Sequence, residues 1–292
     1  MLSFSDVLLG LGLPALCGAI LFLALRRAVG EAAVLAVGVG FLIGYVAINQ
    51  SSWIPLNEPA HCVFLSAATM LLVTAIQQFV WPNAWFWQIG STLILAGAIA
   101  GMFSLLADPE WTVAQKVVWG IVLWVASVLV MIGLEFRFRR RTVVDSGIDD
   151  LIVGVTLTIV SGLTAAVVGM SGTQTYGRIA AVVPATLAPI VLLSILLRTR
   201  IVSPGIAALY VVAVDGMILC TNLFASLTVL NGVLLSLSPV GLYLDYLPVV
   251  RKRAAWQRGA IQLFACLIPA GIAFGLALSK FLRDMSGEFG SW

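Results

Sequence analysis

The chain has 292 residues, of which 61% are hydrophobic and only 10% are charged, and its formal net charge is +3. An ordinary soluble domain carries roughly 45–50% apolar and 25% charged residues, so a water-soluble fold of this size could not bury this much apolar surface. The basic residues lie beside apolar runs rather than on a separate basic domain, so we expect the lipid bilayer as partner and no nucleic acid.

Apolar runs follow one another along the chain, and each is about as long as the 20 residues needed for one helical span. They lie near 5–25, 30–49, 60–80, 84–107, 110–134, 148–169, 178–197, 204–222, 227–249 and 258–282. The sequence therefore predicts an all-α, polytopic integral membrane bundle of about ten transmembrane helices. We expect a single transmembrane domain over residues 1–292, with no soluble domain.

The first run has the charge order of a retained span. It carries Asp6, and its basic pair, Arg26 and Arg27, follows the apolar residues. A secretory signal has the reverse order, with the basic residues first. Further along, Trp85 and Trp87 follow a turn at 81–83 and suit an interfacial aromatic belt.

The basic residues alternate between the two sides of the predicted spans. One side carries twelve of the sixteen, namely Arg26, Arg27, Arg137, Arg139, Arg140, Arg141, Arg198, Arg200, Arg251, Lys252, Arg253 and Arg258. The other side has Lys116, Arg178, Lys280 and Arg283. The positive-inside rule then predicts a cytoplasmic (inner) membrane protein with both termini outside. The run Arg137, Arg139, Arg140 and Arg141 is also a candidate site for anionic lipid head groups, although orientation alone accounts for it.

The region 205–250 contains no Lys or Arg and is long enough for two spans. The turn between them is expected near Thr221-Asn222 or at Asn231-Gly232, and the second is the stronger turn dipeptide. A re-entrant hairpin is the alternative.

Two further patterns concern packing. Ten spans divide into two sets of five, which would allow an inverted repeat of the kind common in transporters. The GxxxG spacing occurs at Gly40 and Gly44, at Gly97 and Gly101, and at Gly271 and Gly275. We expect these glycines to let helices of the same chain approach closely.

Asp215 is the most unusual residue, because it lies near the middle of a predicted span that has no Lys or Arg. A charged side chain at this depth costs roughly 2.5–3.5 kcal/mol or more, so Asp215 is expected to be neutral, paired or facing water. One interpretation is a substrate- or ion-coupling group in a transport cycle, with Asn231 beside it. The other is a structural hydrogen bond to Asn231 or Thr221 of a neighbouring helix.

The sequence predicts no metal site and no cofactor. Glu58 and His61 have a spacing found in metal sites, but His61 is the only histidine, and a helix-start interaction explains the pair better. The four cysteines are far apart and form no CxxC pattern, so we interpret them as apolar fillers.

Gly169-Met-Ser171-Gly172 resembles the sequence around the nucleophile of rhomboid-type intramembrane proteases. That resemblance implies a Ser171–His61 dyad on the outer side. In that family, however, the histidine follows the serine along the chain, whereas here it precedes it. A polar loop joining two helices is the simpler interpretation.

The leading prediction is a small secondary transporter or permease with Asp215 as its coupling or binding group. The length, span count and possible five-plus-five division are similar to those of drug/metabolite transporters, although outside termini depart from that family. The main alternative is a non-catalytic structural or assembly subunit bound to other membrane subunits, which the scarcity of intramembrane polar groups favours. An intramembrane serine hydrolase using Ser171 and His61 is the remote alternative, and the chain is otherwise not expected to be an enzyme.

Overall fold

The computed structural model describes residues 8–26, 32–49, 58–79, 84–105, 111–139, 146–171, 174–197 and 204–289. Helices make up nearly all of this part of the chain, and no strand occurs in it. They are η1 (Leu8–Gly12), α2 (Leu13–Leu25), α3 (Ala32–Ile48), α4 (Pro59–Phe79), α5 (Ala84–Leu105), α6 (Val113–Arg139), α7 (Ser146–Met170), α8 (Gln174–Leu197), α9 (Pro204–Tyr210), η2 (Val211–Asp215), α10 (Gly216–Phe224), α11 (Val229–Leu237), η3 (Ser238–Tyr246), α12 (Pro248–Arg251) and α13 (Ala255–Phe289). The segments η1 and η2 are single π-turns, and η3 is a 3-10 helix.

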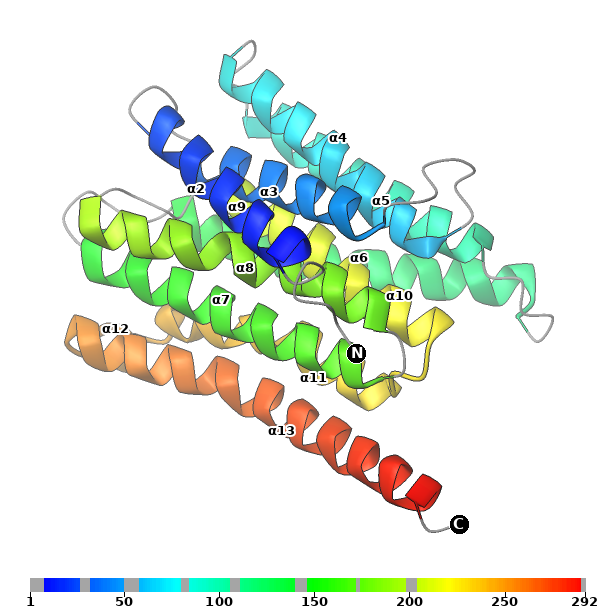
Figure 1. Ribbon diagram of the computed structural model, residues 1–292. Helices are drawn as coiled ribbons and strands as arrows, with labels where there is room; N and C mark the ends of the chain where they lie inside the picture. The colour runs from blue at the N-terminus through cyan, green and yellow to red at the C-terminus, as the bar shows by residue number, and fades with distance from the viewer. Residues whose placement is uncertain are drawn as a thin grey trace.

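In the described residues, nine helices are long and apolar enough to cross a membrane, and the apolar α3, with 17 residues, adds a tenth rod. The rods run back and forth along one direction as a helical bundle (Figure 1). The predicted all-α polytopic fold is therefore confirmed. It follows directly from composition, because a helix is the element that satisfies every backbone polar group within one apolar segment.

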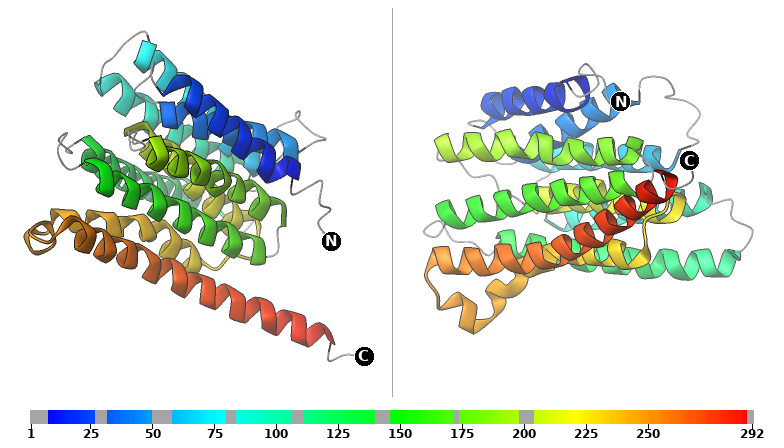
Figure 2. Two further views of the ribbon diagram at one scale, coloured as in Figure 1. Left: turned by 60° about the vertical axis from the view of Figure 1, so that its left-hand side comes forward. Right: turned by 60° about the horizontal axis from the view of Figure 1, so that its bottom comes forward.

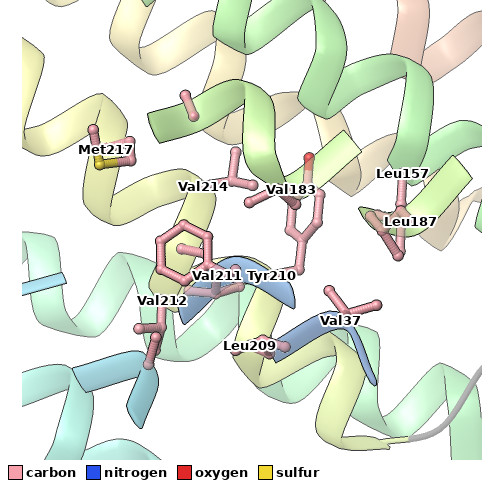
Figure 3. Close-up of a cluster of buried hydrophobic side chains, with 14 of the residues drawn as sticks. Val37, Leu157, Val183, Leu187, Leu209, Tyr210, Val211, Val212, Val214 and Met217 are labelled. Atoms are coloured by element: carbon pink, nitrogen blue, oxygen red, sulfur yellow. The ribbon is translucent and has the colours of Figure 1, made fainter. Parts of the chain in front are cut away.

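The continuous helix formed by α9, η2 and α10 lies at the centre of the bundle. Of its span Gly205–Phe224, 83% is buried inside the protein, more than for any other described span. Its valines and Met217 belong to the same buried hydrophobic cluster as Val183, Leu187 and Leu157 of the surrounding helices (Figure 3). The side chains of this helix are therefore held in place by packing on most of its circumference.

The first and last helices show how the chain crosses the bundle. In both views of Figure 2, η1 begins and α13 ends at the same end of the bundle, while α2 and α13 lie on opposite flanks. Arg26, which follows α2, and the basic turn between α12 and α13 both lie at the other end. The basic ends of the first and last helices thus lie at one end of the bundle, as the alternation of basic residues along the chain predicts. The side of the membrane on which this end lies stays a prediction.

The two halves of the chain pack differently. In a five-plus-five inverted repeat, a twofold axis would exchange α2 with α7 and α3 with α8. The contact between α2 and α8 would then be repeated between α7 and α3. In the described residues α2 packs extensively on α8, whereas no comparable α3–α7 contact exists. The inverted repeat therefore stays a prediction from the span count alone.

The glycine spacings have different roles. A Cβ atom on Gly40 or Gly44 would lie 2.5 Å or less from Thr186 or Val182 of α8, so this pair does serve close internal packing. Gly271 and Gly275 have no atom within 4 Å of such a Cβ, because they lie on the exposed side of α13. The expectation of internal packing was therefore wrong for Gly271 and Gly275.

The turn expected at Asn231-Gly232 was also wrong, because this dipeptide lies within α11. The chain turns at 225–228, a few residues after the alternative near Thr221-Asn222, which lies in the last turn of α10. The Thr228 hydroxyl caps α11 by accepting a hydrogen bond from the Asn231 backbone N–H at 3.3 Å. A capping threonine thus outweighs the intrinsic turn preference of the Asn-Gly pair.

The second half of the ninth rod is the 3-10 helix η3. Pro239 stands at its start and removes a backbone donor from the preceding α-helical ladder. The Ser238 hydroxyl donates to the Cys266 carbonyl and so connects η3 to α13. Gly241 allows η3 and α13 to lie close together, because a Cβ there would lie 2.7 Å from the Ala265 carbonyl carbon.

Tyr210 offers a test of packing at the bundle centre. Its hydroxyl is buried without a hydrogen-bond partner in the described residues. Because such a group carries a desolvation cost of about 1–3 kcal/mol, we expect Tyr210→Phe to raise the free energy of unfolding by about 1 kcal/mol. The measurement is thermal or denaturant unfolding in detergent. Tyr243→Phe is the matched control, because its hydroxyl donates to the Val130 carbonyl and its loss is expected to lower stability.

Candidate functional site

Asp215 is the last residue of the π-turn η2, at the point where the central helix returns to α-helical geometry. Its side chain is only 4% exposed. The preceding Val211, Val212 and Val214 are β-branched residues, which lowers their preference for α-helix and makes a wider turn less costly. Single π-turns inside helices are frequent at functional sites.

A cavity of about 430 Å³ opens beside Asp215. It lies where α6, η2–α10, α11 and η3 come together, and we call it the α6–α11 groove. Its lining consists of Leu123, Ala126, Ser127, Leu129, Val130, Asp215, Ile218, Leu219, Asn222, Val229, Gly232, Val233, Ser236, Leu237, Val240 and Tyr243. The volume falls within the roughly 300–1,000 Å³ range of small-molecule sites.

The few polar groups of the groove gather around the carboxyl. The Ser236 side chain is hydrogen bonded to the Asp215 carboxyl. Ser127 of α6 contributes a further hydroxyl to the same lining. Asn222 lines the groove, while its amide donates to the Leu227 carbonyl at 3.1 Å and holds the turn before α11. Asp215 is the only charged residue in the lining.

Tyr243 of η3 lines the groove and links two of its walls. Its hydroxyl donates to the Val130 carbonyl and ties η3 to α6. Gly133 makes room for this ring, because a Cβ there would lie 2.4 Å from the tyrosine oxygen. Side chains three apart eclipse in a 3-10 helix, so η3 presents Val240 and Tyr243 together to the groove.

Asn231 and Thr221, which were predicted beside Asp215, lie outside the groove lining, and a coupling role for Asn231 stays a prediction. Asn231 is buried and is absent from the groove lining, and its Oδ1 atom has no hydrogen-bond partner in the described part of the chain. Thr221 donates to the Met217 carbonyl of its own helix at 2.7 Å. Ser236, five residues after Asn231, provides the hydrogen bond instead.

Ser171 and His61 each engage backbone groups of their own segment. The Ser171 hydroxyl donates to the Val167 carbonyl at 2.8 Å, and the His61 Nδ1 atom lies 3.3 Å from the Glu58 carbonyl. The ring of His61 also meets Tyr45, with centroids 6.0 Å apart. The dyad stays a prediction, and the geometry at Glu58 agrees with a helix-start interaction.

The remaining predicted sites have these outcomes. Within the described ranges, no three His, Cys, Asp or Glu side chains gather so that they could hold a metal ion. The lipid head-group prediction lies outside the described residues, because Arg140 and Arg141 and the side chains of Arg137 and Arg139 are not among them.

A second buried carboxyl was missed from the sequence. Glu135 is 1% exposed and accepts a hydrogen bond from the Trp87 indole at 2.7 Å. Trp87 is fully buried, so its assignment to an interfacial aromatic belt was wrong. The sequence signal that could have found this pair is the matched position of an acid at the end of one rod and a tryptophan at the start of its antiparallel neighbour.

The Trp87–Glu135 pair gives a test of this inter-helix bond. We expect Trp87→Phe to lower the free energy of unfolding by about 2 kcal/mol, because removing the donor to a buried polar group costs roughly 1–3 kcal/mol. Unfolding in detergent measures the effect. Trp124→Phe is the control, since its indole is only partly buried and donates to the backbone carbonyl of Thr92, so that its loss is expected to cost less. Equal losses in the two variants would contradict a special role for Glu135.

Comparison of the chain with models of known protein families, with curated proteins and with solved structures finds no match to any of them. The α6–α11 groove is therefore the feature of this chain that bears on its function.

Proposed function

We propose that this membrane protein is a small permease that binds a small solute in the α6–α11 groove, with Asp215 as the binding or coupling group. The observation that carries the proposal is a buried carboxyl bordering a cavity of about 430 Å³. A carboxyl kept only for structure would be enclosed by its hydrogen-bond partners, whereas this one has open space beside it.

The local helix geometry supports a transport site. Transporter sites lie near the bilayer midplane, where interrupted helices free polar groups. Asp215 lies near the middle of the span Gly205–Phe224 and ends a π-turn. Across the groove, the ninth rod changes from α-helix to 3-10 helix at Ser238. The π-turn η2 and the 3-10 helix η3 thus both border the groove that contains Asp215, the only charged residue of its lining.

The experiment is uptake into proteoliposomes containing the purified chain. Candidate solutes come from a thermal-shift screen of a chemical library against the protein in detergent. We expect Asp215→Asn to abolish uptake of the solutes that are found. Asp245→Asn is the matched control, because Asp245 lies on η3 outside the groove lining and the change in chemistry is identical. Unchanged uptake by Asp215→Asn would contradict the proposal.

A subunit role is the second candidate, and one observation favours it. The exposed side of α13 carries Gly271 and Gly275 with open space above them, flanked by exposed Ile268 and Ile272. Such a surface allows close approach of another helix. Under this role, Asp215→Asn would leave a native membrane complex intact in blue native electrophoresis, whereas Gly271→Leu would dissociate it.

A further inference from the structure

The mouth of the α6–α11 groove is formed by exposed apolar side chains. Leu129 of α6 is 64% exposed, and Val229, Val233 and Leu237 of α11 are 69%, 48% and 51% exposed. In the described residues, α6 contacts η2 and η3, whereas its contact with α11 is at most marginal. The groove therefore opens between α6 and α11.

The floor of the groove lies at mid-span, at the depth of the bilayer core. Ser127, Asp215 and Ser236 each lie near the middle of their own span, in Val113–Glu135, Gly205–Phe224 and Val229–Tyr246 respectively. The α11 rim of the mouth runs from Val229, the first residue of its span, to Leu237 near the middle, and the exposed apolar side chains of both rims face lipid chains. A ligand can reach Asp215 sideways, from within the membrane.

The chemistry of the lining selects the ligand. Most of the lining is aliphatic, so it favours an apolar body. An ionised carboxyl in such surroundings needs a counter-charge, because burying an unpaired charge is costly. The lining offers no Lys or Arg to Asp215, so a ligand can supply the missing positive charge. Tyr243 also lines the groove and adds an aromatic ring, whose face is favourable beside a cation.

We propose that the α6–α11 groove binds lipophilic organic cations, such as hydrophobic amines, which enter it laterally from the bilayer. This proposal rests on the permease function and adds its substrate class and entry route. The cation lies against Asp215 and Ser236, and the apolar body lies along α6 and α11. A hydrophilic solute of the same charge would gain little from the aliphatic walls.

The first test compares probes of one shape and opposite charge. Radiolabelled tetraphenylphosphonium and tetraphenylborate are bound to the purified full chain in detergent by scintillation proximity. We expect tetraphenylphosphonium to bind at least about tenfold more tightly than tetraphenylborate, and tetramethylammonium not to compete. Equal binding of both tetraphenyl ions, or competition by tetramethylammonium, would overturn the proposed ligand class.

The second test uses variants of the floor and the mouth. We expect Asp215→Asn to weaken tetraphenylphosphonium binding about tenfold while leaving tetraphenylborate binding unchanged. Val233→Trp should block the mouth and reduce binding by a similar factor. Leu230→Trp is its matched control, because Leu230 is 59% exposed on the same helix but does not line the groove. Leu129→Trp, on the opposite rim, tests the mouth independently if Val233→Trp does not fold.

The outcomes separate this inference from the proposed function. Tight, Asp215-dependent binding without uptake into proteoliposomes would retain the ligand class and contradict the permease. Asp215-dependent uptake of a hydrophilic solute, without tetraphenylphosphonium binding, would support the permease and contradict the ligand class. Loss of binding in Leu230→Trp as large as in Val233→Trp would contradict lateral entry.

Discussion

Replacing Asp215 is expected to abolish uptake and, at the same time, to make the protein more stable. Asp215→Leu removes a buried carboxyl whose desolvation costs free energy, and the groove beside it leaves room for the larger side chain. We expect the free energy of unfolding to rise by about 1–2 kcal/mol, as when buried charged groups are replaced by apolar ones. Uptake should fall to the level of empty liposomes, because nothing in the lining replaces the charge.

The combination of lost uptake and raised stability distinguishes a functional carboxyl from a structural one. A functional site retains a group that is unfavourable for folding because the chemistry requires it. A carboxyl that only connects two helices would show the reverse, since its removal leaves Ser236 unpaired and lowers stability. Thermal unfolding and uptake are measured on the same preparations, with Asp215→Asn as the isosteric variant. A large loss of stability in both variants would support the structural role.

The sequence predicts the rods well because their signal is local. Each span is a run of apolar residues of sufficient length, and its ends are marked by charges. Asp215 stands out for the same reason, because an acid within an apolar run is visible without knowledge of its neighbours. The existence of a membrane bundle and its most informative residue could therefore be predicted from the chain alone.

The groove could not be predicted, because it depends on long-range packing. Ser127, Asp215, Ser236 and Tyr243 come from three separate rods, and no local pattern brings them together. Asn231 was predicted as a polar partner of Asp215, but Ser236 of the same helix α11 lines the groove instead. Likewise, Trp87 has the sequence of an interfacial residue and is buried because Glu135 of α6 lies opposite it.

Two glycines, Gly169 of α7 and Gly177 of α8, meet where these helices cross. A Cβ atom on Gly177 of α8 would lie 2.5 Å from the Gly169 Cα atom and 2.9 Å from its nitrogen. Both are backbone atoms, so neither can move aside without shifting α7 relative to α8. These helices share the most extensive contact in the described bundle. We expect Gly177→Ala to lower the free energy of unfolding by about 3 kcal/mol, at the upper end of overpacking costs.

The crossing is asymmetric, and this provides the control. A Cβ on Gly169 would meet the Gly177 Cα atom at 3.7 Å, and one on Gly162 would meet Pro184 at 4.0 Å, both ordinary contact distances. Gly169→Ala and Gly162→Ala on α7 should therefore be nearly neutral. Unfolding in detergent or bicelles measures all three variants. Equal destabilisation by Gly169→Ala and Gly177→Ala would mean that helix propensity or general crowding, and not the geometry of this crossing, sets the limit on residue size. The binding groove depends indirectly on the same crossing, because α7 and α8 both pack against the central helix that carries Asp215.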